Sequence, residues 1–206
     1  MQKIMFNDRC GLTTAVLTGH KIMTRRIVPE MVGRKYKKEP DIVWDENEEC
    51  FLVFKDNDDI EPILLYPKYK RGEVVAIAQK YIDLKDCNAF YDALGKADPN
   101  MPLECIPGEK GCYNKMFVKA SWMPHQVRIT NIRVERLQDI SKDDCLFEGI
   151  YQSPCPPELY GFKVNGTWRS FTDARKAFAA LIDKVSGRGT WESNPYVYVY
   201  EFDLWK

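Results

Sequence analysis

Hydrophobic positions recur with a clear period in the last third of the chain. The stripe between 172 and 185 follows helical spacing, with Gly187 placed to end it, and consists of Ala174, Ala177, Phe178, Leu181, Ile182 and Val185. The run from Tyr196 to Phe202 is apolar on both sides, which is typical of a strand buried on both faces. The pattern therefore predicts a helix over 172–185 followed by a strand over 196–202.

Shorter patterns predict the elements of the N-terminal part. We expect a strand over 3–6, a helix over 13–17 capped by Thr13 or Thr14 and ended by Gly19, an extended strand over 21–26 and a strand over 74–78. The segment 74–78 is apolar on both faces, as in a strand inside a sheet or barrel. Several strands with two or three short helices indicate an α+β domain with a barrel-like sheet.

The segment 126–137 has the alternation of a long strand, but its phase slips once. Val127 and Ile129 share one parity, whereas Ile132 and Val134 share the other. A β-bulge near Thr130-Asn131 would produce this slip, because one extra residue moves all later side chains to the opposite face. The Ser141-Lys142-Asp143-Asp144 segment that follows resembles a capping box and predicts a short helix ending near Gly149.

Two stretches interrupt these elements, and we interpret them as insertions at about 30–70 and 82–115 in a single domain spanning 1–206. In the first, two apolar runs at 42–44 and 51–54 flank an acidic segment, which predicts a surface hairpin. The second contains Pro99, Pro102, Pro107, Gly108 and Gly111 and is expected to be a long loop.

Composition narrows the possible functions. The chain has 206 residues, of which 45% are hydrophobic, so it can form a sizeable core. Its 30 Lys+Arg balance its 30 Asp+Glu at a pI near 6.7, so any contact with nucleic acid must use a local basic patch.

The N-terminal residues, the apolar runs and the cysteines predict a cytoplasmic protein. The first residues are too short an apolar run for a secretory signal, and no apolar run is long enough to cross a membrane, so we expect no membrane partner. Seven scattered cysteines suggest reduced thiols. With only two histidines and no Cys-x-x-Cys pair, we expect neither a metal nor another cofactor. The oligomeric state is left open.

The candidate chemistry lies in the segment 19–26, where a lysine, a threonine and two arginines follow a turn glycine. Its pattern Gly19-x-Lys21-x-x-Thr24-x-Arg26 resembles the signature of the ASCH family, a branch of the PUA-like β-barrels. The turn Arg71-Gly72-Glu73 resembles the second conserved turn of this family. Two further segments are similar to the long branch of the family that is common in bacteriophages and prophages: 133–141 with Glu148-Gly149-Ile150, and Trp191-x-x-Asn194-Pro195.

This resemblance implies a mixed PUA-like barrel that binds RNA, a nucleotide or a nucleoside in a basic pocket. The residues that it points to as ligand-binding are Gly19, Arg25, Arg26, Gln79, Trp191 and Asn194. Members of the phage-type branch often have a glutamate near the end of the second strand, about where Gln79 stands. A further alternative is a phage or prophage accessory protein whose pocket is degenerate.

The resemblance also raises an enzymatic alternative, because the ASCH family includes a bacterial acetylcytidine amidohydrolase. By that analogy Thr24 would be the nucleophile, Lys21 its base and Glu148 the acid. A lysine acts as a base only when neutral, which requires burial or nearby cations to lower its pKa. In a regular strand, however, Lys21 and Thr24 would point to opposite faces, so they can meet only across an irregularity.

Overall fold

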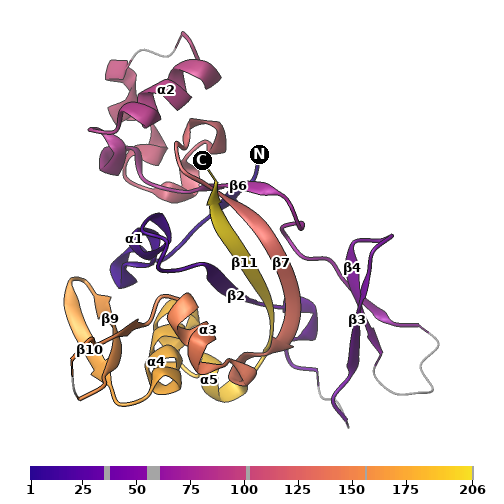
Figure 1. Cartoon of the computed structure of the whole chain (residues 1–206). Helices are drawn as coiled ribbons and strands as arrows, with labels where there is room; N and C mark the ends of the chain where they lie inside the picture. Colours follow the sequence, from indigo (N-terminus) through magenta and orange to yellow (C-terminus); the bar gives the residue numbers. More distant parts are fainter. Residues whose placement is uncertain (35–37, 55–60, 101–102, 156, 206) are drawn as a thin grey trace.

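The computed structural model describes residues 1–34, 38–54, 61–100, 103–155 and 157–205. Within them the largest sheet has five strands in the order β1-β6-β7-β11-β2. Their bounds are Lys3–Ile4 (β1), Val74–Ile77 (β6), Gln126–Arg136 (β7), Tyr196–Trp205 (β11) and Met23–Ile27 (β2). Figure 1 shows β7 and β11 as two long, curved neighbours at the centre of the molecule.

The central pair carries the bulge that the alternation predicts. β7 and β11 are antiparallel, with Glu201 opposite Asn131 and Phe202 opposite Ile129, so Thr130 is the extra residue. The bulge lets both halves of β7 bury their apolar side chains, since Val127, Ile129 and Ile132 are all buried. This prediction is confirmed.

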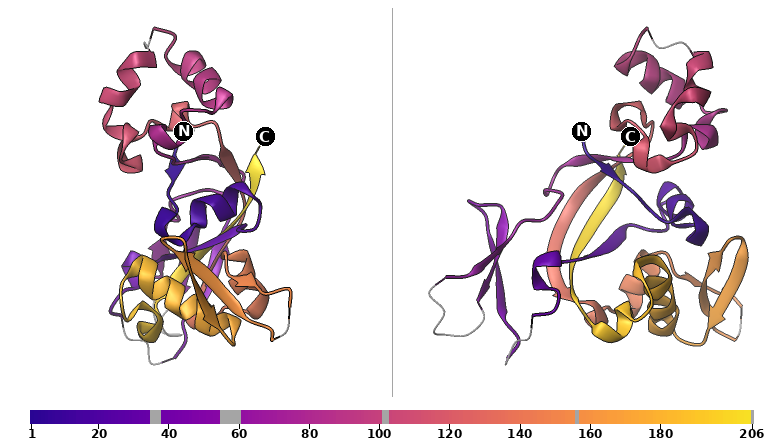
Figure 2. Two further views of the ribbon diagram at one scale, coloured as in Figure 1. Left: turned by 90° about the vertical axis from the view of Figure 1, so that its left-hand side faces the viewer. Right: turned by 180° about the vertical axis from the view of Figure 1, so that it is seen from behind.

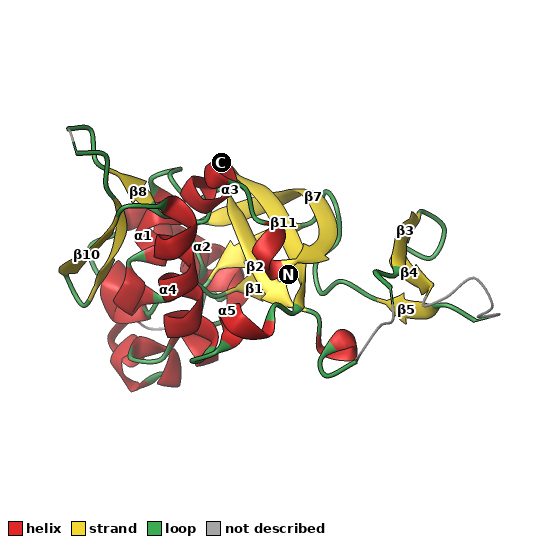
Figure 3. Cartoon of the chain, turned by 90° about the horizontal axis from the view of Figure 1, so that it is seen from below, coloured by secondary structure: helices red, strands yellow, loops and turns green. Residues whose placement is uncertain are grey.

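Helices cover one side of the sheet, as the view from below shows (Figure 3). They are α1 (Leu12–Leu17), α3 (Lys142–Phe147), α4 (Ala174–Ser186) and the short α5 (Thr190–Ser193). The cap of α3 is the predicted Ser141, whose hydroxyl accepts a hydrogen bond from the Asp144 amide. The predicted cap of α1 is wrong: Gly11 precedes the helix, and the Thr13 hydroxyl instead donates to Asp8 at 2.5 Å.

A second sheet, absent from the elements that the sequence patterns predict, packs beside α4. It consists of β8 (Tyr151–Gln152), β9 (Tyr160–Val164) and β10 (Thr167–Phe171), in the order β10-β9-β8. Asn165 and Gly166 join β9 to β10, and both have positive φ. An Asn-Gly pair in this conformation is the strongest local signal for a hairpin, so the sequence does contain this information.

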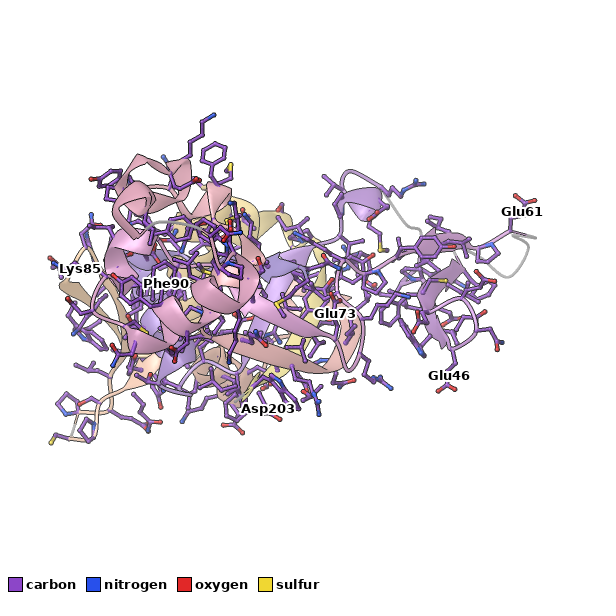
Figure 4. All side chains as sticks on the ribbon, turned by 90° about the horizontal axis from the view of Figure 1, so that it is seen from above. Glu46, Glu61, Glu73, Lys85, Phe90 and Asp203 are labelled. Atoms are coloured by element: carbon purple, nitrogen blue, oxygen red, sulfur yellow. The ribbon has the colours of Figure 1, made fainter. Side chains whose placement is uncertain are left out.

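The first insertion forms the predicted hairpin. β3 (Asp41–Asp45) pairs antiparallel with β4 (Cys50–Phe54), and β5 (Ile63–Leu65) adds a third strand. The right-hand view of Figure 2 shows this sheet beside the main one, and the labelled Glu46 and Glu61 lie on the part that projects from the rest of the molecule in Figure 4. Its inner side contacts the main sheet through the rings of Phe51 and Tyr198, 6.3 Å apart.

The second insertion is not the loop that its prolines and glycines predict. It contains α2 (Asn88–Ala97) and several 3₁₀ turns, drawn at the top of Figure 1. Phe90 and Leu94 of this segment join Tyr81 and Trp122, which flank it, in a hydrophobic cluster separate from the main core. The prediction is wrong because these side chains pack into a local core, which stabilises the segment despite its prolines and glycines.

The α+β class is confirmed. Within the described residues β1 and β2 are the edges of the main sheet and no hydrogen-bonded pair joins them, so the sheet is open rather than a closed barrel. A search of the same residues finds no helix with the length and apolar character needed to cross a membrane.

Candidate functional site

A cavity of about 250 Å³ lies beside β2, one of the two edge strands of the main sheet. Its polar wall contains Lys21, Thr24 and Glu148, and its apolar wall is formed by Phe6 and by side chains of α4 such as Phe178. We call it the Lys21 cavity. It therefore brings together the three residues that the family resemblance points to as catalytic.

An irregular chain path explains how Lys21 and Thr24 can line the same cavity. α1 is followed by Gly19 at φ +72°, and the amides of Lys21 and Ile22 bond outside the sheet: Lys21 N donates to Ala15 O and Ile22 N to Phe147 O. β2 begins only at Met23. Because strand alternation does not extend back to Lys21, its side chain and that of Thr24 both line the cavity.

Lys21 and Glu148 form a buried pair. The Lys21 ammonium donates to Glu148 Oε2 at 2.5 Å and to the Glu148 carbonyl oxygen at 2.8 Å, and the two residues are only 2% and 4% exposed. Burial lowers the pKa of Lys21, and the charges of Arg26 and Arg25 act in the same direction, although the Glu148 carboxylate opposes them. The site thus favours the neutral amine more than water does.

Thr24 and Arg26 are neighbours on the same face of β2. Thr24 is 5% exposed and lines the cavity, and its hydroxyl makes no hydrogen bond to any described residue. Arg26 is half-buried, and its guanidinium donates to the Met5 carbonyl oxygen at 2.6 Å. Thr24 therefore offers a hydroxyl to a ligand, and Arg26 offers a cation with further donors.

Arg25 is engaged in ion pairs with the protein itself. Its guanidinium contacts Glu135 at 2.6 Å, Asp144 at 2.6 Å and Glu148 at 3.2 Å, and its side chain is fully buried. Arg133 extends this network through Asp144 at 2.7 Å. Although one side of Arg25 lines the Lys21 cavity, its charge is compensated, so its clearest role is to hold Glu148 in place.

The other predicted ligand residues do not line this cavity. Gln79 follows β6, with its Oε1 2.7 Å from Nδ1 of His125. Trp191 packs edge-on against Phe178, and Asn194 accepts a hydrogen bond from the Gln138 amide at 2.8 Å in a left-handed turn. Gly19 supplies the turn before Lys21. These residues shape the chain around the site or lie apart from it.

Sequence reasoning missed the apolar wall. Phe178, Leu181 and Ile182 belong to the helical stripe, which predicts core positions, and the sequence contains no signal that some of these side chains also border a cavity. A metal is not indicated: among the described residues there is no group of three or more His, Cys, Asp or Glu side chains that could hold one.

Comparisons of the chain with family models, with curated proteins and with solved structures find no match. The functional conclusion therefore depends on the geometry of the site.

Proposed function

We propose that this chain is an ASCH-type, PUA-like protein that binds a nucleoside, a nucleotide or RNA through the Lys21 cavity. The observation that carries the proposal is the convergence of Lys21, Thr24 and Glu148 on one cavity from segments more than a hundred residues apart. Ligand sites typically combine an apolar wall with a few polar groups, and this cavity has both.

The size and charges of the cavity favour part of a nucleotide as the ligand. Its volume of about 250 Å³ is close to the lower limit of small-molecule sites, about 300 Å³. Phe6 and Phe178 offer apolar surface to a base, and Thr24 and the Lys21–Glu148 pair offer donors and acceptors to its polar edge. Arg26, at the same cavity, is suited to a phosphate.

The test is a titration of a short single-stranded RNA at several salt concentrations. We expect Thr24→Val to weaken binding and Arg26→Gln to reduce the slope of log affinity against log salt by about one, because one phosphate contact is lost. Lys163→Gln and Arg169→Gln, exposed cations of the β9–β10 hairpin, are the matched controls. Equal effects of Arg26→Gln and Arg169→Gln would refute the proposed site.

A second candidate function, hydrolysis of an acylated nucleoside such as N4-acetylcytidine, is favoured by one specific contact. The 2.5 Å contact between Lys21 and Glu148 allows a single proton to move between base and acid. The Thr24 oxygen would attack the acyl carbon while the neutral Lys21 amine takes the hydroxyl proton. Lys21 would pass this proton to the Glu148 carboxylate, which would deliver it to the leaving nitrogen, and water would then hydrolyse the threonine ester to release the carboxylic acid.

Incubation with N4-acetylcytidine separates the two functions. Hydrolysis predicts release of cytidine and acetate in equal amounts, and Thr24→Val abolishes it because the nucleophile is gone. Thr24→Ser is the matched variant, since it keeps a hydroxyl and should retain turnover. Binding of acetylcytidine without release of acetate would leave the binding function and eliminate the hydrolase.

A further inference from the structure

A second cavity, of about 360 Å³, adjoins the Lys21 cavity and is lined by tyrosines. Tyr198 and Tyr200 come from β11, while Tyr66 and Tyr69 follow β5. Tyr69 and Tyr200 meet edge to face, with ring centroids 5.2 Å apart. We call it the tyrosine cavity. Nothing in the proposed function uses it.

The two cavities share a wall. Met5, Arg26 and Ile27 line both of them. In the register of β2 and β11, Arg26 lies opposite Tyr198 and Thr24 lies opposite Tyr200. Directly opposite residues of antiparallel strands share a face of the sheet. One face of the sheet therefore carries Thr24, which lines the Lys21 cavity, and Tyr198 and Tyr200, which line the tyrosine cavity. Arg26 lies on the same face and lines both cavities.

Cations outnumber anions around the tyrosine cavity. Among the described lining residues these are Lys3, Arg26 and Lys68, against the single carboxylate of Glu30. The Lys3 ammonium is occupied by the carbonyl oxygens of Met116 and Val118, at 2.6 and 2.7 Å. Lys68 is exposed and forms no ion pair with any described residue; its ammonium lies 5.3 Å from the centre of the Tyr69 ring.

Two further features point to a ligand in this cavity. Tyr66 is 55% exposed although it lines the cavity, so an aromatic side chain is accessible for stacking there. Tyr198 is 5% exposed, and its hydroxyl has no hydrogen-bond partner among the described residues. A buried hydroxyl without a partner destabilises the free protein, and a polar atom of a ligand that reached it would remove this cost.

We propose that the tyrosine cavity receives the base of a second nucleotide, so that the ligand is a single strand of at least two nucleotides. The first base occupies the Lys21 cavity, and Arg26, which borders both cavities, contacts the phosphate between them. Aromatic rings bind bases of any sequence by stacking, and a cation between two base sites suits the connecting phosphate. The inference rests on the proposed function and specifies its ligand.

Calorimetric titration of matched mononucleotides and dinucleotides tests this arrangement. The probes are the four nucleoside 5′-monophosphates and the dinucleotides ApA, CpC, GpG and UpU. At least one dinucleotide should bind about fivefold or more tightly than its monophosphate, which is the gain expected from one stacked base. Binding of monophosphates without any gain for dinucleotides would overturn the second site but leave the proposed function. No binding of either probe would eliminate both.

A variant at the protein surface tests whether the tyrosine cavity provides the gain in dinucleotide affinity. Tyr66→Ser removes the exposed ring and should abolish the difference between dinucleotide and monophosphate while leaving monophosphate affinity unchanged. Tyr113→Ser is the matched control, because Tyr113 is 71% exposed and does not line the cavity. A dinucleotide gain that survives Tyr66→Ser would overturn the inference. An equal loss for both probes would also overturn it, because it would indicate one site in the tyrosine cavity rather than two.

Discussion

The two faces of the β2–β11–β7 sheet differ in how their polar groups are used. On one face Arg25, Arg133, Glu135 and Glu201 form an ion-pair network that Asp144 of α3 completes. On the other face, Thr24, Arg26, Tyr198 and Tyr200 border two cavities. Both faces result from one alternating pattern, since each strand sends successive side chains to opposite sides.

The contrast shows that a charged residue near a candidate site can be either a structural ion-pair partner or a ligand contact. Arg25 and Arg26 are adjacent in the sequence and chemically identical, yet within the described residues Arg25 pairs with three carboxylates and Arg26 donates to a single backbone carbonyl. A buried charge must be compensated, so Arg25 is a structural requirement. Arg26 retains donors for a ligand. Four experiments test the difference between the two faces.

The largest effect is expected for Arg25→Met. This substitution leaves Glu135, Asp144 and Glu148 without their shared cation and should lower the free energy of unfolding by about 3–5 kcal/mol. Urea denaturation measures it, with Arg169→Met on exposed β10 as the control. A loss below about 1 kcal/mol, within the range of surface substitutions, would contradict the structural role of the network.

Lys21→Met should be milder, because Glu148 keeps its contact with Arg25 at 3.2 Å. We expect the free energy of unfolding to fall by about 1–3 kcal/mol, the cost of leaving a buried acceptor partly unpaired. The variant should also lose ligand binding under conditions in which circular dichroism shows that it is folded. Unchanged affinity for the RNA probe would show that the Lys21 cavity is not the binding site.

The pH dependence of hydrolysis tests the state of Lys21. Only the neutral amine takes a proton, so kcat/KM should rise with pH up to the pKa of Lys21 and level off above it, changing about tenfold per unit on the rising limb. Burial lowers this pKa, so the half-maximum should lie below 10.5. A half-maximum at or above that value, or a rate that falls as pH rises over this range, would reject Lys21 as the base.

The smallest expected effect concerns two tyrosines on the face of Thr24 and Arg26. Removing their hydroxyls should change stability in opposite directions. Tyr198→Phe removes a hydroxyl that has no described partner, so stability should stay the same or rise by up to about 1 kcal/mol. Tyr200→Phe removes an acceptor of the Lys68 amide, 3.0 Å away, and should lower stability by about 1 kcal/mol. Thermal denaturation of both variants compares them, and equal losses would mean that the Tyr198 hydroxyl has a partner in solution.

Several features of the fold could be predicted from local sequence. The stripe that ends at Gly187 predicts α4, the phase slip predicts the bulge at Thr130, and Ser141 predicts the start of α3. Each depends on side-chain period or on a cap, which involves residues close together in the chain. The helical segment around α2 could not be predicted in this way, because its stability comes from packing among Tyr81, Phe90 and Trp122.

For the candidate site, the sequence alone determined the set of chemical groups: a lysine, a threonine and arginines after a turn glycine, and a glutamate at the end of a short helix. Only the tertiary structure decided which of them meet. The irregular path through Ile22 places Lys21 beside Thr24, the end of α3 brings Glu148 to the amine, and Gln79 remains outside the cavity. The physical reason is that a cavity is made by packing distant segments, and no local period encodes which side chains will border the space between them.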